Sequence, residues 1–282
     1  VACGTRIEVA LGAAIHLRDG ARLSSRGADG CPVVWTSAAS DPAPGDWNGI
    51  VVGREASFGA TATTLEYAGR HRAALEVEAG GRARLDEVRL RRSGAGGMRV
   101  EPGGKLARAK DLVFSNVAGT ACRAPAAEIG RLEEPTVDEA DGAFEVGGGV
   151  VDRATSWDFP RIELTLRDDV RVRDVLTVTA ETRLAFATGA RAVVEKGGIL
   201  RALGDEELSY DAPHRYVEMR FGHGSGIEFR ASAGGGNVFR WTRFSGPGLG
   251  DELPIYRAEG VAVELLHSTR AAEALPRHAR NG

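Results

Sequence analysis

The feature that most constrains this chain is an internal repeat of roughly 23 residues. Three consecutive segments align with one another: "LEYAGRHRAALEVEAGGRARLDE" from Leu65, "VRLRRSGAGGMRVEPGGKLARAKD" from Val88 and "LVFSNVAGTACRAPAAEIGRLEE" from Leu112. The pairs Gly80-Gly81 and Gly103-Gly104 fall in register. A fixed repeat of this length indicates stacked structural units, each of which buries its apolar face only against its neighbours.

Within each segment, apolar residues alternate with charged ones, as in "ALEVEA" and "ARLDEVRLRR". This period of two is typical of a β-strand with one buried face. Helical periodicity over several turns is scarce, and only the stretch from Ser268 to Arg280 could hold a helix. We therefore expect an all-β solenoid of parallel strands, with little helix and with coils about 4.8 Å apart.

A larger duplication overlies the short repeat. "RIEVALGAAIHLRDGARLSS" from Arg6 resembles "VLTVTAETRLAFATGARAVV" from Val175, and "GDWNGIVVG" from Gly45 aligns with "GHGSGIEFR" from Gly222. "TLEYAG" from Thr64 likewise matches "VFRWTRFSG" further on. The chain is thus predicted to hold two homologous units.

The seam between the two units is acidic, rich in glycine and weakly periodic. It separates a first unit at residues 1–135 from a second at 161–282, with residues 136–160 expected to be an insertion or linker. Either the units continue into one another as one solenoid or they form two short ones.

These motifs resemble bacterial right-handed parallel β-helix proteins of the pectin-lyase-like superfamily. "LTVTAETRLAFATGARAVVEKGGILRALG" from Leu176 and "CPVVWTSAASDPAPGDWNGIVV" from Cys31 match the recurring block of that family, and the likeness covers nearly the whole chain outside the seam and the C-terminal residues. The resemblance implies a right-handed parallel β-helix. It implies no activity, because the superfamily includes lyases, hydrolases, adhesins and surface proteins.

Composition excludes some partners. The formal net charge is -3, which gives no electrostatic basis for binding nucleic acid or an anionic membrane. No apolar run approaches the roughly 20 residues of a transmembrane helix. The first residue is Val1, so the sequence does not reveal a native targeting segment.

The three cysteines match no zinc-binding pattern. Two interpretations stay open. All three are small buried thiols, or Cys3 and Cys31 form a disulfide near the first coils and Cys122 stays free.

His223, in Gly222-His223-Gly224, is the most suggestive catalytic candidate, because hydrolases of this superfamily use a histidine in such a triplet. They also need aspartates on neighbouring coils. The Asn-Thr-Asp set is missing upstream, the pair Asp168-Asp169 lies far away in the chain, and the downstream Arg-x-Lys signature is missing too. We therefore assign no catalytic residue, and expect His223 to occupy the same corner as Asp46 of "GDWNGI".

Other weak binding candidates are an aromatic ring and an acidic loop. Trp47 either covers the edge of the core at a corner or stacks on a sugar. His16 is expected to face outward and to be inert. The loop "GDEELSYDAPH" could hold calcium, but it lacks the alternating oxygen ligands of an EF-hand, so a solvated loop and no metal site are favoured. Its candidate residues are Asp205, Glu206, Asp211 and His214.

The sequence favours a non-catalytic function over an enzymatic one: a secreted or surface-anchored bacterial scaffold, structural or adhesive, in contact with glycans or other envelope proteins. One alternative is a polysaccharide lyase or glycoside hydrolase of the same fold. Another is end-to-end self-assembly through the solenoid ends, which expose backbone groups.

Overall fold

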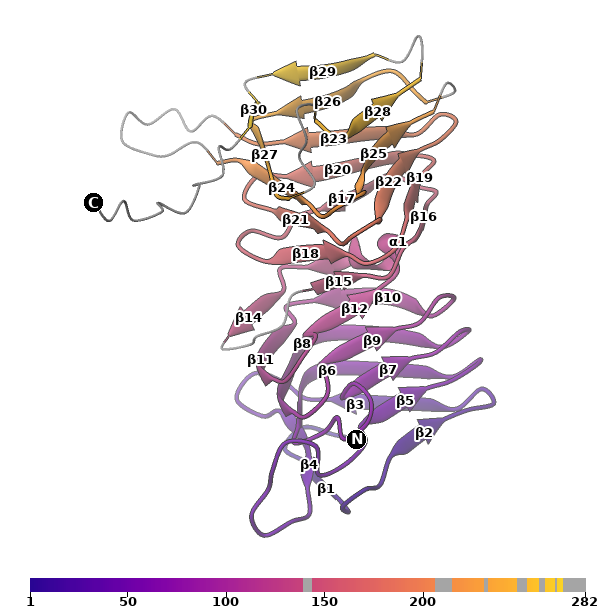
Figure 1. Ribbon diagram of the computed structural model, residues 1–282. Helices are drawn as coiled ribbons and strands as arrows, with labels where there is room; N and C mark the ends of the chain where they lie inside the picture. The colour runs from indigo at the N-terminus through magenta and orange to yellow at the C-terminus, as the bar shows by residue number, and fades with distance from the viewer. Residues whose placement is uncertain are drawn as a thin grey trace, which may run out of the picture.

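The chain folds into a parallel β-helix, seen from the side in Figure 1. The computed structural model describes residues 1–138, 144–205, 215–230, 233–247, 253–258, 262–266 and 268–270. Within these ranges, the named strands pair in parallel and the single helix is the short α1, Ala126–Ile129. The all-β solenoid predicted from the repeat is confirmed.

Sheet 1 runs the length of the solenoid and has eleven strands. They are β2 (Ile15–Leu17), β5 (Ile50–Val52), β7 (Leu75–Val77), β9 (Met98–Val100), β12 (Cys122–Ala124), β15 (Phe144–Val146), β18 (Glu163–Leu166), β21 (Arg183–Phe186), β24 (Val217–Phe221), β27 (Thr242–Ser245) and β30 (Thr269–Arg270).

Sheet 2 belongs to the first half of the chain and has nine strands. They are β1 (Arg6–Val9), β3 (Arg22–Arg26), β4 (Val33–Ser37), β6 (Ser57–Glu66), β8 (Arg82–Ser93), β10 (Lys105–Lys110), β11 (Val113–Val117), β13 (Leu132–Glu133) and β14 (Thr136–Asp138).

Sheets 3 and 4 belong to the second half and have five strands each. Sheet 3 contains β16 (Gly149–Val151), β19 (Val170–Val172), β22 (Arg191–Val194), β25 (Gly226–Phe229) and β28 (Ile255–Arg257). Sheet 4 contains β17 (Thr155–Trp157), β20 (Val175–Thr179), β23 (Ile199–Leu203), β26 (Asn237–Arg240) and β29 (Val263–Leu266).

The core consists of apolar columns that continue from coil to coil. In sheet 1, register places Met98, Cys122, Phe144 and Leu164 directly above one another, and all four are buried. Cys122 is the free cysteine, and burial raises the pKa of its thiol far above the usual range. It serves as a small apolar side chain of the core.

The two halves differ in how they turn from the second face of the coil to the third. In the first half, β6 and β8 run through both faces and bend at one residue with positive φ. The residues at this corner in four successive coils are Ala62, Glu87, Asp111 and Glu134, with φ of 41°, 55°, 51° and 51°. In the second half, sheets 3 and 4 are separate and loops such as 152–154, 173–174 and 195–198 connect them.

A tight turn follows sheet 1 in several coils, closed by a hydrogen bond from the fourth residue's N–H to the first residue's carbonyl. The third residue has positive φ and is usually glycine, as at Gly80, Gly189 and Gly224. "GHGS" at residues 222–225 is one of these turns, because the Ser225 N–H donates to the Gly222 carbonyl. "GDWN" instead precedes a sheet 1 strand, β5. The predicted equivalence of His223 and Asp46 is therefore wrong: the shared Gly-x-x-x-Gly-Ile spacing occurs at two different corners.

The seam continues the solenoid. Residues 144–157, expected to form part of a linker, supply β15, β16 and β17, which pair with β18, β19 and β20. Sheet 1 passes through this region without a break, from β12 to β15 to β18. The glycines in "EVGGGVVD" interrupt the alternation of apolar and polar residues, so the sequence does not show these strands clearly. The apolar residues of the segment are nevertheless buried: Phe144, Val146, Val151 and Trp157.

At the seam, α1 takes the place of a strand above the start of β10. The carboxylate of Glu128, only 2% exposed, accepts a hydrogen bond from the Leu106 N–H at 2.8 Å, which is an otherwise unpaired edge amide. Lys105 Nζ lies 3.2 Å from the same carboxylate. The Glu128 side chain thus accepts the hydrogen bond that a further strand at this edge of the sheet would have accepted.

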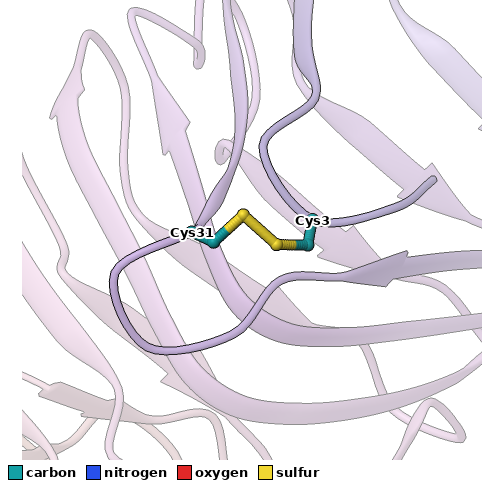
Figure 2. The surroundings of a disulfide bond; sticks show 2 residues. All are labelled: Cys3 and Cys31. Carbon is teal, nitrogen blue, oxygen red and sulfur yellow. A yellow bond between two sulfur atoms is a disulfide. The ribbon is translucent and has the colours of Figure 1, made fainter.

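A disulfide joins Cys3 to Cys31 at the N-terminal end, with the two Cα atoms 5.4 Å apart (Figure 2). Cys31 lies in the loop between β3 and β4, and Cys3 precedes β1. Of the two sequence interpretations, the structure contains the disulfide.

Candidate functional site

Charged residues on the outside of the solenoid form ladders in which one glutamate binds arginines from the coils before and after it. Glu195 contacts Arg173 at 2.7 Å and Arg230 at 3.2 Å. Glu145 likewise lies between Arg123 and Arg167, at 3.8 and 2.8 Å. Opposite charges on adjacent strands stabilise a sheet and fix its register.

Glu195 is the centre of the most highly charged ladder. The hydrogen bond from Arg173 lowers the pKa of the Glu195 carboxyl, and the positive charges of Arg173, Arg230 and Arg171 add to this effect. The carboxylate therefore stays ionised over the neutral range, and it serves as a link between coils rather than as a proton donor.

In the first half, Glu66 plays the same part but is almost completely buried, at 4% exposure. Its carboxylate lies 2.6 Å from Arg91 Nη2 and accepts a hydrogen bond from Thr36 at 2.8 Å. With two partners, this buried charge is satisfied.

A cavity of about 790 Å³, which we call the seam groove, lies where sheet 2 ends and sheet 4 begins. Four carboxylates line it, from three successive coils: Glu133 and Glu134, then Asp158, then Glu181. Leu132 and Pro135 form apolar parts of its wall, and Lys110 and Arg161 are its cations. An acidic groove of this kind could bind hydroxyl-rich or cationic groups.

Two of these carboxylates already have partners. Glu134 lies 3.5 Å from Lys110 Nζ, and Asp158 accepts a hydrogen bond from the Thr179 hydroxyl at 2.7 Å. Within the described residues, no group of three or more His, Cys, Asp or Glu side chains could hold a metal ion. The repeat does not reveal this groove, because the walls of the groove come from the seam, where the repeat is weakest.

The structure separates the candidates that the sequence suggested. His223 is exposed on its tight turn, and its carbonyl accepts a hydrogen bond from the Gly189 N–H of the coil below. It does not line the seam groove. His16 is exposed on β2, as expected for an outward residue.

Trp47 is not available to a sugar. Its ring is fully buried, and its indole N–H donates to the Glu66 carbonyl at 2.9 Å. The stacking role is wrong for this residue, because the corner closes over the ring and leaves no face exposed.

The acidic loop is described only at its start. Asp205 lies 3.0 Å from Arg215 Nη2. Glu206, Asp211 and His214 lie outside the described residues, so a calcium-binding role for this loop stays a prediction.

No protein-family model matches this chain, and no curated protein sequence matches it. Among solved structures, the chain is similar to the TibC-catalysed, hyper-glycosylated TibA55-350 fragment. The sequence identity is 12% and the TM-score 0.22, over 93% of this chain and 98% of that one. A likeness this distant carries no functional information. Separately, none of the helices in the described residues is long and apolar enough to cross a membrane.

Proposed function

We propose that this chain is a non-catalytic β-helix scaffold, secreted or displayed on a bacterial cell surface, which presents its rigid faces to glycans or envelope proteins. The observation that carries the proposal is the set of ladders centred on Glu66, Glu145, Glu195 and Glu218, each of which links consecutive coils. Each of these carboxylates is bound to arginines. The disulfide fits an oxidising compartment outside the cytosol.

The test is an assay for polysaccharide cleavage. The protein is incubated with a panel of neutral and acidic polysaccharides, with and without calcium, and new reducing ends and unsaturated ends are measured. A scaffold releases neither. Release of ends that disappears in a double variant of the seam groove, Asp158→Asn with Glu181→Gln, would overturn the proposal.

The four carboxylates of the seam groove favour a second candidate function, a polysaccharide hydrolase or lyase. Glycoside hydrolysis needs two carboxyl groups that flank the scissile bond, and this groove contains carboxylates from several coils. The same assay separates the candidates, since only the enzyme links cleavage to Asp158 and Glu181.

Self-association through the solenoid ends remains a third proposal. Light scattering over a wide range of concentrations tests it directly: growth in mass with concentration supports it, and a constant monomer mass contradicts it.

A further inference from the structure

One outward face of the first half carries arginines without acidic partners. We call it the arginine face and define it by eight residues in three strands. The outer rows are Arg22, Ser24 and Arg26 of β3, and Arg82 and Arg84 of β8; the middle row is Ser57, Gly59 and Thr61 of β6. Register places Arg22, Ser57 and Arg82 in one column, and Ser24, Gly59 and Arg84 in the next. The third column is Arg26, Thr61 and then Asp86, whose carboxylate lies 3.4 Å from Arg108.

The four arginines differ from those of the ladders. All four are exposed, and within the described residues none forms an ion pair with a carboxylate. Their one hydrogen bond to a side chain there is from Arg26 Nε to Ser24 Oγ, at 3.0 Å. Their guanidinium groups therefore keep donors available for an external ligand.

The arrangement does not help the fold. Arg82 pairs in register with Lys105, and Arg84 with Arg108. Like charges directly opposite one another on adjacent strands are destabilising. Arg99 and Arg123 of sheet 1 also lie opposite each other in register, but each has a glutamate within ion-pair distance, Glu101 and Glu145 respectively. Adjacent rows of cations without such glutamates have no structural benefit and are typical of a binding surface.

The middle row leaves space between the arginines. The β3 and β8 rows lie on either side of β6, so they are separated by two strand spacings, roughly 10 Å. A Cβ added at Gly59 would meet nothing within 4 Å, and its φ is not in the left-handed region. Neither packing nor backbone conformation therefore requires glycine here, and the lack of a side chain keeps the centre of the face open.

We propose that the arginine face binds a linear anionic polysaccharide, which lies along the β6 row with its carboxylate, sulfate or phosphate groups between the two rows of arginines. The planar guanidinium binds such groups through paired hydrogen bonds, and the Ser57 and Thr61 hydroxyls add donors. No aromatic residue is among the eight, so stacked bases of a single-stranded nucleic acid find no platform. No large apolar residue is among them to enter a membrane.

This inference deepens the proposed scaffold function by giving the partner of one face. It can fail independently, because binding and cleavage are measured separately: loss of binding leaves the cleavage assay unchanged, and cleavage at the seam groove leaves the arginine face unchanged.

The test is binding of fluorescent dextran sulfate to the full chain, followed by anisotropy, with neutral dextran of the same size as the control. We expect dextran sulfate to bind, neutral dextran not to bind, and the affinity to fall between about 50 and 200 mM salt because exposed charges are screened. Arg82→Ser with Arg84→Ser should weaken binding at least about tenfold, since each charge-assisted contact contributes about a factor of ten or more.

The matched control is Arg240→Ser with Arg257→Ser, which removes two exposed arginines from β26 and β28 in the other half of the molecule. It changes the net charge equally and should leave the affinity within about twofold, because the proposed ligand contacts a different face. Equal losses in the two double variants would overturn the proposal, because binding would then follow net charge alone.

A second variant keeps the fold and blocks the face. Gly59→Glu places a carboxylate between Ser24 and Arg84 in open space, so binding should be lost while the melting temperature does not fall. Gly59→Ala should bind as the wild type does. Wild-type affinity in Gly59→Glu contradicts the proposal, as does tighter binding to single-stranded DNA or to phosphatidylglycerol vesicles than to dextran sulfate.

Discussion

The two halves of the solenoid share sheet 1 but use charge in different ways. In the second half, glutamates such as Glu195 and Glu218 are each held by arginines of neighbouring coils. In the first half, Glu66 does the same on one face, while the arginine face keeps its cations unpaired. The difference shows that the ladders are not a general consequence of a charged β-helix. Ion pairing therefore has to be established face by face from the register of the coils.

The largest expected effect concerns the connection between the halves. Phe144 packs edge to face against Phe114 on the first-half side and Phe159 on the other, with ring centroids 5.4 and 6.0 Å apart. Phe144→Ala should lower the free energy of unfolding by about 3–5 kcal/mol through a cavity in the shared core. Urea unfolding followed by circular dichroism measures this loss.

The same experiment tests whether the halves fold together. Because sheet 1 is continuous through the seam, we expect one cooperative transition in the wild type. Two separate transitions in the wild type would show that the two halves are independent domains.

The disulfide should affect the first half more than the second. Cys3→Ser with Cys31→Ser removes a cross-link over a sequence separation of 28, and the chain-entropy model gives a loss of about 3–4 kcal/mol for a loop of this size. Hydrogen exchange should show a larger loss of protection in β1 to β4 than in β20 to β26, because local opening near the cross-link adds to the shared global unfolding. Equal loss of protection in both halves would contradict this local role.

The next effect tests the edge where sheet 2 stops. Glu128→Ala leaves the Leu106 N–H without its acceptor and Lys105 without its partner. We expect a loss of about 1.5–3 kcal/mol in the free energy of unfolding, typical of a buried hydrogen bond to a charged group. Glu134→Ala, whose partner Lys110 also has Asp111 within 4.0 Å, is the control and should cost under about 1 kcal/mol. Equal losses would show that α1 does not act as the cap of β10.

The smallest effect is a pH dependence in the second half. The pKa of Glu195 is lowered in the folded protein, chiefly by the Arg173 hydrogen bond. Its stabilisation is therefore present above the unfolded carboxyl pKa, about 4.3, and is lost as the pH falls through the lower folded value. In the wild type, the free energy of unfolding should fall as the pH drops below about 4.3. In Glu195→Gln, this fall should be smaller. Glu8→Gln, at an exposed position, should keep the wild-type slope.

The repeat predicted the fold because alternation and corner glycines both reflect local requirements. The aligned segments begin at Leu65, Val88 and Leu112, whereas the register stacks Leu65 with Leu90 and Phe114. The alignment is therefore two residues off between its first two segments, and the alternation still gives the right buried face because a shift of two keeps the face. Within the expected linker, residues 144–157 form strands of the solenoid, and the sequence did not reveal them because glycines interrupt the alternation even though Phe144 and Trp157 are core residues. The Gly-x-x-x-Gly-Ile match failed for a different reason: spacing alone cannot distinguish a corner before sheet 1 from one after it.

The sites were harder to predict than the fold. Trp47 was placed at a corner correctly, but whether the ring faces inward depends on the neighbouring coil, which supplies the Glu66 carbonyl. The seam groove and the arginine face both depend on which coils lie next to each other. Arg22 and Arg82 are distant in the chain and come within two strands of each other only through the Ser57 register.

The tight turns after sheet 1 have a consequence for engineering. The second turn residue in two consecutive coils is Thr188 and then His223, and other coils place Asp19, Arg54, Ala79 and Pro102 at the same point. The turn tolerates a hydroxyl, an imidazole, a carboxylate, a guanidinium, a methyl group or a proline ring there. These positions repeat along the rod at the spacing of the coils, about 4.8 Å. Reporter groups or epitopes could therefore be attached at multiples of that distance.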